Sequence, residues 1–130
     1  MVDYVAFTPE FSSERLVGFH QDWVYKITPE KLHSMLSGSE FALLALEGEK
    51  VIGYIAVLGD GAVFAYISSL EVLEPYRGRG IGKELVRRVI AAYQDRYAVD
   101  LLCDETLLAF YEPLGMIPVR GACVRNYNAS

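Results

Sequence analysis

The sequence has little cysteine, no long hydrophobic run and no signal-peptide pattern, and each absence excludes a class of protein. Two cysteines among 130 residues are too few for a disulfide scaffold and fit the reducing cytosol, so we expect a cytoplasmic protein. The longest apolar stretch, Val51 to Leu58, is much shorter than the roughly 20 residues that span a membrane. The first residues show no basic segment followed by an apolar one, so we expect neither a signal peptide nor a membrane partner.

A surplus of positive charge is also absent, which argues against a nucleic-acid partner. The chain carries 12 lysines and arginines against 17 aspartates and glutamates, a net charge of −5, whereas duplex-binding domains normally have a basic surface. Five of the 12 cations nevertheless fall between residues 77 and 88: Arg77, Arg79, Lys83, Arg87 and Arg88. Such a concentration of positive charge in an acidic chain indicates a binding site for a small anion.

What the sequence does contain is enough apolar material for one folded domain. Hydrophobic residues make up 52% of the chain and charged residues 22%, a balance that excludes intrinsic disorder. A chain of this length usually forms one domain, and no repeat, low-complexity tract or linker divides it. We therefore expect a single domain over residues 1–130.

The first half of the chain predicts two helices and two hairpins. Residues 2–7 favour a short strand, and the segments 12–23 and 28–38 each begin with a capping residue typical of a helix N-terminus. Three β-rich runs follow, separated by short glycine-containing turns: 41–46, 51–58 and 63–72. Because turns this short join neighbouring strands, we expect the three runs to pair antiparallel.

The second half predicts an amphipathic helix and two more strands. Between Gly80 and Asp95 apolar residues recur every three or four positions, with charged residues on the opposite side. A strand over 98–103, a brief helix over 105–111 and a last strand over 117–126 complete the order β-α-α-β-β-β-α-β-α-β. This order is typical of an α/β (α+β) domain with a mixed sheet.

A glycine-rich turn between residues 77 and 83 is the most informative segment of the chain. It follows a predicted strand and begins a predicted helix, whose N-terminal N–H groups attract phosphate. Gly78, Gly80 and Gly82 lack side chains that would hold a diphosphate away from those groups. The spacing fits neither a P-loop, because Arg77 stands where that loop needs its first glycine, nor the dinucleotide fingerprint, whose third glycine would come one residue after Gly82.

The spacing that does fit is Arg77-Gly78-Arg79-Gly80-Ile81-Gly82, and here the sequence resembles the GNAT superfamily of acetyl-CoA-dependent N-acetyltransferases. The preceding Leu70-Glu71-Val72 and Pro75 strengthen the resemblance. A second motif, Phe110-Tyr111-Glu112-Pro113-Leu114-Gly115-Met116, is similar to the family's Phe-Tyr-x-x-x-Gly-Phe, with Met116 in place of the final Phe. Asp104 stands where many members carry Asn. The resemblance implies a mostly antiparallel mixed sheet of six to seven strands flanked by about four helices.

The resemblance also implies where acetyl-CoA binds. In the family two neighbouring strands splay apart, and the pantetheine arm lies in the gap like an additional strand. The implied cofactor-binding residues are Leu70, Val72, Arg77, Gly78, Arg79, Gly80, Ile81, Gly82, Lys83, Asp104 and Phe110. Tyr111 matches the tyrosine that protonates the departing thiolate, a role that suits a phenol with a pKa of about 10. Arg87 and Arg88 fit the solvated face of a helix.

The sequence does not single out a general base. Glu71 is a candidate because alternation places its side chain opposite Leu70 and Val72, although a bulge would invert that count. The other candidates are Ser68, Ser69, Glu47, Asp104 and a chain of water molecules, and Asp104 could equally cap a helix. His20 and His33 are isolated and unlike metal ligands, so we expect no metal. Cys103 and Cys123 are expected in the core, and Trp23 and Tyr25 either there or in the wall of an acceptor pocket.

The function implied is transfer of the acetyl group from acetyl-CoA to a primary amine of a small molecule or peptide. The alternative is a catalytically silent module of the same fold that senses acyl-CoA. The acidic net charge favours a cationic acceptor. We expect a monomer or a homodimer, for which residues 122–127 of the last strand would offer a pairing edge.

Overall fold

The protein is built on one five-stranded sheet with the strand order β1-β2-β3-β4-β5. The computed structural model describes residues 1–129. Strands β1 (Val2–Ala6), β2 (Phe41–Glu47), β3 (Lys50–Gly59) and β4 (Phe64–Val72) pair antiparallel, and β5 (Ala98–Asp100) pairs parallel to β4. The two predicted hairpins are therefore confirmed.

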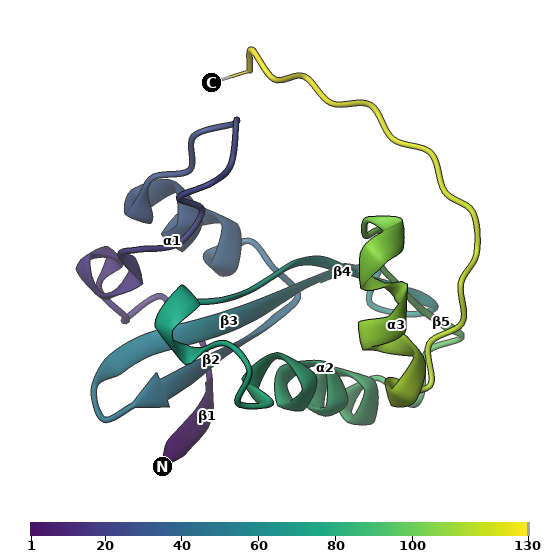
Figure 1. Ribbon diagram of the computed structural model, residues 1–130, viewed down its shortest axis with the longest axis horizontal. Helices are drawn as coiled ribbons and strands as arrows, with labels where there is room; N and C mark the ends of the chain where they lie inside the picture. Colours follow the sequence, from purple (N-terminus) through teal and green to yellow (C-terminus); the bar gives the residue numbers. More distant parts are fainter. Residues whose placement is uncertain (130) are drawn as a thin grey trace.

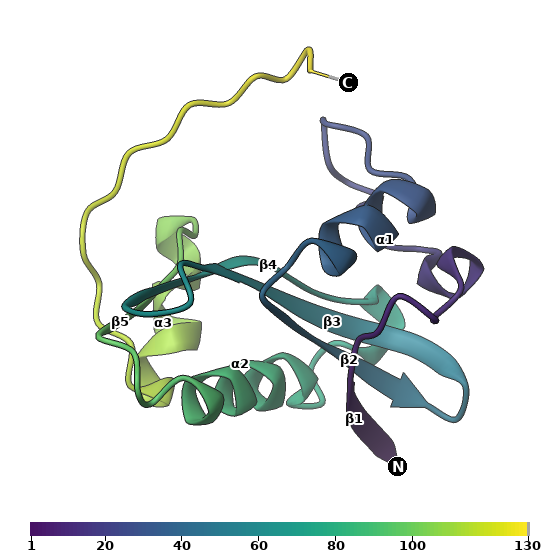
Figure 2. The same ribbon diagram turned by 180° about the vertical axis from the view of Figure 1, so that it is seen from behind.

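Helices cover both faces of the sheet (Figures 1 and 2). Helix α1 (Pro29–Ser37) lies on one face, and helix α2 (Ile81–Ala92) lies on the other. The short helix α3 (Leu108–Tyr111) lies beside β4 and β5. Thr28 caps α1, since its side-chain oxygen accepts a hydrogen bond from the Lys31 N–H at 3.1 Å. None of the helices within residues 1–129 is long and apolar enough to cross a bilayer.

The sheet separates two apolar cores. The α2 side buries alternate side chains of the central strands, such as Ile55 and Val57, against Leu85, Val86 and Val89 of the helix. The α1 side buries the intervening side chains, which include Leu44, Tyr54 and Ala56, against Leu16, Leu32 and Leu36. Successive side chains of β3 therefore pack alternately into the α2-side core and the α1-side core. This explains why the strand is apolar on both faces.

A β-bulge in β4 decides which side chains of that strand face which core. Ala56 pairs with Ser69 but Val57 pairs with Ile67, so β4 has one residue more than β3 at this point. Ile67 and Leu70 consequently both pack on the α2 side. Glu71 points to the α1 side, where His20 contacts it.

Strands β4 and β5 pair over only three residues and then separate. The pairs are Phe64 with Ala98, Ala65 with Val99 and Tyr66 with Asp100. The predicted strand over 98–103 is therefore shorter than expected. Beyond Tyr66, β4 continues to Val72 with β3 on one side and no strand of residues 1–129 on the other. This divergence creates the gap in which the site described below lies.

The predicted helix over residues 12–23 is wrong. Only Ser13–Leu16 forms a short 3-10 helix, which Ser12 caps by accepting the Glu14 N–H at 3.2 Å. Gly18 at φ 93° and His20 at φ 63° both adopt left-handed backbone conformations. Because an α-helix cannot contain such residues, the chain continues to α1 as an irregular loop.

The predicted last strand over 117–126, with its pairing edge at 122–127, is also wrong. Residues 117–129, the C-terminal arm, follow an extended path around the outside of the molecule without joining the sheet (Figures 1 and 2). A strand needs a neighbour to complete its hydrogen bonds, and none flanks the arm within the described residues. The structure therefore has five strands and three α-helices over residues 1–129 instead of six to seven strands and about four helices.

Candidate functional site

The glycine-rich turn presents an open backbone surface at the start of α2. Gly78 and Gly80 both have φ 81°, a left-handed conformation that favours glycine. Gly80 is the N-cap of α2 and has no side chain to cap the first N–H groups. A Cβ added at either glycine would meet no heavy atom within 4 Å. The turn is thus free for a ligand to approach the positive end of the helix dipole.

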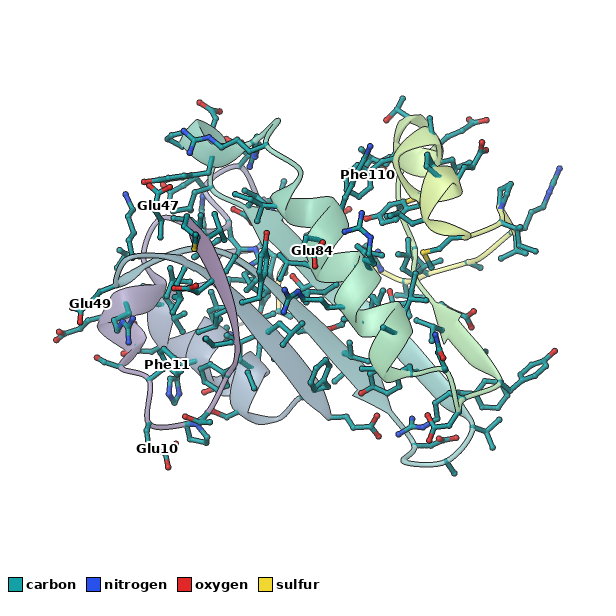
Figure 3. The ribbon with its side chains drawn as sticks, turned by 90° about the horizontal axis from the view of Figure 1, so that it is seen from below. Glu10, Phe11, Glu47, Glu49, Glu84 and Phe110 are labelled. Carbon is teal, nitrogen blue, oxygen red and sulfur yellow. The ribbon has the colours of Figure 1, made fainter. Side chains whose placement is uncertain are left out.

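Gly82 serves a different purpose from the one the sequence suggested. A Cβ at this position would lie 3.3 Å from Phe110 Cζ and 3.8 Å from Val72 Cγ2. Phe110 lies between α3 and the N-terminal half of α2 (Figure 3). The absent side chain of Gly82 therefore gives room to Phe110, and the two predicted motifs meet through this contact. Ile81, which was predicted to bind the cofactor, buries its side chain in the α2-side core.

The cations of the turn differ in what holds them. Arg77 Nε donates to the carbonyl of Val72 at 2.8 Å, so this side chain fastens the turn to the end of β4. Arg79 lies 3.6 Å from a Glu47 carboxylate oxygen and over the ring of Tyr76. Lys83 is exposed and forms none of the ion pairs found within residues 1–129.

The two arginines further along α2 are part of its solvated surface, as the simpler interpretation predicted. Arg87 and Arg88 both pair with Glu84, and Arg88 also lies over the ring of Tyr4. Glu84 lies on the face of α2 turned away from the sheet (Figure 3). Their charges are thus already compensated within the helix.

A cleft of about 510 Å³ opens where β4 and β5 separate. Tyr111 of α3 lines it from one side and Trp23 of the loop before α1 from another. The rest of its wall comes from β4, from the segment after β5 and from part of the C-terminal arm: residues 66–70, 101–104 and 107, with 121–123 and 125. Leu70 thus lies at the cleft, whereas the Val72 carbonyl is already bonded to Arg77.

Tyr111 is one of two phenols that line this cleft, the other being Tyr66 of β4. Tyr111 is half-buried and packs edge-to-face on Phe110, with ring centroids 4.9 Å apart. Burial raises the pKa of Tyr111, and a charge on the neighbouring Cys103 thiol would raise it further. The phenol is therefore protonated at neutral pH and able to donate a proton.

Glu71 occupies the α1 side of β4, with its carboxylate held from the loop before α1. The main-chain N–H of His20 lies 3.1 Å and 3.0 Å from the two carboxylate oxygens. Burial raises the pKa of Glu71 above its usual range, and the hydrogen bond from His20 works in the opposite direction. A carboxylate with a raised pKa is a better proton acceptor than an exposed one.

The residues around Glu71 form a buried polar cluster that the sequence did not predict, although Ser69 was one of the candidate bases. His20 Nε2 lies 2.6 Å from the Tyr54 hydroxyl, which also bonds to the Ser69 hydroxyl. Burial lowers the pKa of His20 to about 4, so its imidazole is neutral, and raises the pKa of Tyr54. These residues are far apart in the sequence and belong to no motif. Only the strand register and the bulge bring them together.

The remaining predicted residues have varied surroundings. Asp104 is exposed at the N-cap of the turn Glu105–Leu107, makes no capping bond with its side chain and lines the cleft. Cys103 is half-buried, whereas Cys123 is exposed on the C-terminal arm, so its predicted core position is wrong. Trp23 is 45% exposed and lines the cleft, so of its two predicted positions the one in the core is wrong. Residues 1–129 contain no group of three or more side chains placed to hold a metal.

Comparison with known proteins gives a consistent result. The sequence model of the acetyltransferase (GNAT) family matches residues 4–116. Over 86 residues the chain is 35% identical to N-alpha-acetyltransferase MAK3 of Arabidopsis thaliana. That match covers 60% of this chain and 45% of the relative, so it spans less than half of that protein.

Two solved structures resemble the whole chain. One, inferred to be an acetyltransferase from Deinococcus radiodurans R1, is 34% identical with a TM-score of 0.93 over 98% of this chain and 90% of that one. The other, a GNAT family acetyltransferase from Streptococcus pneumoniae TIGR4, is 27% identical with a TM-score of 0.79 over 97% and 98% of the two chains.

Proposed function

The chain belongs to the GNAT acetyltransferase family, a family of acyltransferase enzymes, and from that premise we propose that it transfers the acetyl group of acetyl-CoA to a primary amine of a small molecule or peptide. One observation carries this proposal. Tyr111 lines the gap between β4 and β5, and its neighbour Phe110 packs against Gly82 of a glycine turn whose backbone is open at Gly78 and Gly80. A splayed pair of strands with a phosphate-binding helix terminus suits an extended thioester ligand that ends in a diphosphate.

The residues of the turn fit the diphosphate of acetyl-CoA. The free space at Gly78 and Gly80 is what close approach of a phosphate to backbone N–H groups requires. Lys83 adds an exposed positive charge that no carboxylate of residues 1–129 compensates. We assign the diphosphate to the backbone from Arg77 to Lys83 and the pantetheine arm to the free edge of β4 near Leu70. Gly82 and Phe110 support the turn by packing.

The reaction forms a C–N bond, breaks a C–S bond and moves two protons. The nitrogen of a neutral amine attacks the thioester carbon and forms the new C–N bond, and the C–S bond then breaks to release the CoA thiolate. Tyr111 donates its phenolic proton to that sulfur. The proton lost by the amine nitrogen passes to the α1 side of β4, where Glu71 accepts it. Tyr111 lines the cleft, and Glu71 follows the lining residue Leu70 in β4 and contacts His20, on the loop that also carries the lining residue Trp23.

The acceptor is proposed from charge. The net charge of −5 attracts a cationic amine over long range. Asp22 and Trp23 lie on the loop that passes Glu71. A cationic amine attached to an apolar group would there meet the Asp22 carboxylate with its charge and the Trp23 ring with its apolar part. We take residues 1–130 as one catalytic domain that works in the cytoplasm, as a monomer or a homodimer.

The first experiment is a calorimetric titration of acetyl-CoA into the wild type, Gly80→Glu and Gly48→Glu. Gly48 is a matched control because it also has a left-handed backbone, φ 61°, and open space around its Cβ. The wild type and Gly48→Glu should bind with a Kd of about micromolar order, near −8 kcal/mol. Gly80→Glu should show no binding, since it places a carboxylate at the diphosphate. A folded wild type that binds no acetyl-CoA at millimolar concentration would contradict the proposal.

Turnover is tested separately with a panel of primary amines and detection of the released thiol. Tyr111→Phe should bind acetyl-CoA like the wild type but release thiol about 10 to 100 times more slowly, because the leaving sulfur loses its proton donor. If no amine gives thiol release while acetyl-CoA binds, the protein is a sensor of acyl-CoA and the proposed transfer is wrong.

A further inference from the structure

The loop before α1 carries an unusual backbone conformation where it meets β4. Among residues 1–129, His20 is the only residue other than glycine with a positive φ, 63°. This conformation costs a non-glycine residue of order 1 kcal/mol or more, and such residues are maintained only where the surroundings fix them. In His20 it turns the main-chain N–H toward the carboxylate of Glu71, at 3.1 Å and 3.0 Å from the two oxygens.

The imidazole of His20 is what fixes the turn. The residue is only 4% exposed and packs edge-to-face against Trp23, with ring centroids 4.5 Å apart. Its Nε2 lies 2.6 Å from the Tyr54 hydroxyl, and that hydroxyl also bonds to Ser69. Tyr54 belongs to β3 and Ser69 to β4, so two strands of the rigid sheet hold the loop.

The second ring nitrogen faces the same carboxylate. Nδ1 is buried, has no hydrogen-bond partner and lies 3.5 Å from Glu71 Oε1. A bare Nδ1 would place a lone pair against a carboxylate. With the proton on Nδ1, a positively polarised N–H group instead lies 3.5 Å from that oxygen, which is favourable in charge although no hydrogen bond forms. Nε2 then accepts from the Tyr54 hydroxyl, and Tyr54 accepts from the Ser69 hydroxyl. Nε2 and both hydroxyls then have compatible partners and Nδ1 no longer repels the carboxylate, which favours the Nδ1–H tautomer.

We propose that His20 is a positioning residue for the base Glu71: its main-chain N–H holds the carboxylate by hydrogen bonds, its Nδ1 lies 3.5 Å from the same carboxylate, and the Ser69–Tyr54 hydroxyl chain fixes the tautomer that puts a proton on Nδ1. The inference rests on the proposed role of Glu71. It adds a source of stabilisation for the ionised form of a carboxylate that is largely buried, since one N–H hydrogen bond and a second, nearby N–H group act where water is excluded.

The charged groups that face Glu71 are few. Asp22, on the same loop as His20, disfavours the ionised carboxylate, and Arg77, at the end of β4, favours it. Tyr54 of β3 is neutral because burial raises the pKa of its phenol. A change confined to the Tyr54 hydroxyl leaves Asp22, Arg77 and the main-chain N–H of His20 in place, so it isolates the effect of the imidazole tautomer.

The experiment is a carbon-13 NMR titration of the Glu71 side-chain carboxyl in the wild type, Tyr54→Phe and Tyr93→Phe, together with the pH profile of kcat/KM. Tyr93 is the control, because its hydroxyl also bonds a carboxylate, Glu40 at 2.8 Å, on the other side of the molecule. In Tyr54→Phe the pKa of Glu71 should rise by about half a unit or more, since the Nδ1–H donor is no longer fixed. The acid limb of kcat/KM should move by the same amount, with acetyl-CoA affinity unchanged.

A Glu71 pKa that is the same in the wild type and a folded Tyr54→Phe overturns the proposal. If Tyr54→Phe does not fold, nitrogen-15 shifts of the wild-type imidazole decide, with His33→Gln to assign the two histidines. The Nδ1–H form supports the proposal, and the Nε2–H form or an imidazolium at pH 7 overturns it. The NMR results do not depend on turnover, so a failure of the proposed acetyl transfer would be seen separately in the amine panel.

Discussion

The glycine turn that follows β4 and the surroundings of Glu71 on β4 are built from different chemical groups. On one side, the turn from Arg77 to Lys83 offers backbone N–H groups and is contiguous in the sequence. On the other side, Glu71 accepts from the main-chain N–H of His20, and the imidazole of that residue is held in turn by a chain of side chains from β3 and β4, Tyr54 and Ser69. The turn depends on glycines that leave its backbone N–H groups open, whereas the cluster beside Glu71 depends on side chains that bond to one another.

This difference determines how each side responds to substitution. A site made of N–H groups tolerates changes of its neighbours but not a side chain or charge placed in its open space. A buried polar cluster is the reverse, because each group is satisfied only by its particular partners and an orphaned group costs free energy. The predictions below test this contrast, beginning with the largest effect.

The strongest test is Glu71→Gln. Glutamine keeps the shape and can still accept the His20 N–H through its amide oxygen, but it cannot take the proton of the amine. We expect kcat/KM for the amine to fall by about 100-fold or more, while the Kd of acetyl-CoA changes by less than about twofold. Steady-state kinetics and calorimetry measure the two quantities.

Glu74→Gln is the matched control, since Glu74 is exposed three residues further along the chain. It should leave both quantities unchanged. Activity of Glu71→Gln within fivefold of the wild type would show that the proton leaves by another route, and the α1 side of β4 would then be a structural feature only.

The second test uses the buried imidazole as a pH probe of stability. The pKa of His20 is lowered to about 4 in the folded protein, against about 6.5 when unfolded. The neutral ring therefore stabilises the fold above pH 6.5, and this contribution is lost as pH falls toward 4. Between pH 7.5 and pH 5 the free energy of unfolding should drop by about 2 kcal/mol from this group.

Urea unfolding of the wild type, His20→Asn and His33→Asn at both pH values measures that drop. Asparagine tolerates the left-handed backbone of position 20. The wild type and His33→Asn should show the full pH dependence, and His20→Asn should lack about 2 kcal/mol of it. Equal pH dependence in all three proteins would mean that the ring is protonated freely in the folded state.

The same contrast explains what could be predicted from the sequence. The hairpins and α2 follow from local patterns, namely short glycine turns and a period of three to four, and the structure confirms them. The glycine turn could be recognised because backbone sites leave glycines in a fixed spacing. The face of Glu71 was predicted from alternation alone, and it holds only because the bulge falls before Ser69 rather than after it.

The errors have a common physical cause. Capping and apolar residues predicted a helix over 12–23, but the contacts of His20 with Tyr54 and Glu71 stabilise a left-handed turn there that local propensity opposes. Residues 117–126 have strand-like composition, yet strand formation depends on a pairing edge that lies elsewhere in the chain. Long-range partners decide both segments, and a single sequence does not reveal them.

A smaller effect separates two cations of α2. Lys83 is exposed and unpaired within residues 1–129, whereas Arg87 pairs with Glu84. Lys83→Ala should weaken acetyl-CoA binding about fivefold to tenfold, roughly 1 kcal/mol, because a charged hydrogen-bond donor to the diphosphate is lost. This loss should shrink at high ionic strength. Arg87→Ala should change the Kd less than twofold, and equal losses in both variants would indicate only a general effect of net charge.

The smallest effect is expected at Gly82, and it tests whether this glycine makes room for Phe110 or for the ligand. Alanine favours a helix by about 1 kcal/mol over glycine, but its Cβ would lie 3.3 Å from Phe110 Cζ. The two effects oppose each other, so Gly82→Ala should change the free energy of unfolding by less than about 1 kcal/mol. In a Phe110→Leu background the crowding disappears, and the same substitution should stabilise the protein in urea unfolding. Loss of acetyl-CoA binding by Gly82→Ala at unchanged stability would instead mean that all three glycines face the ligand, as their spacing first suggested.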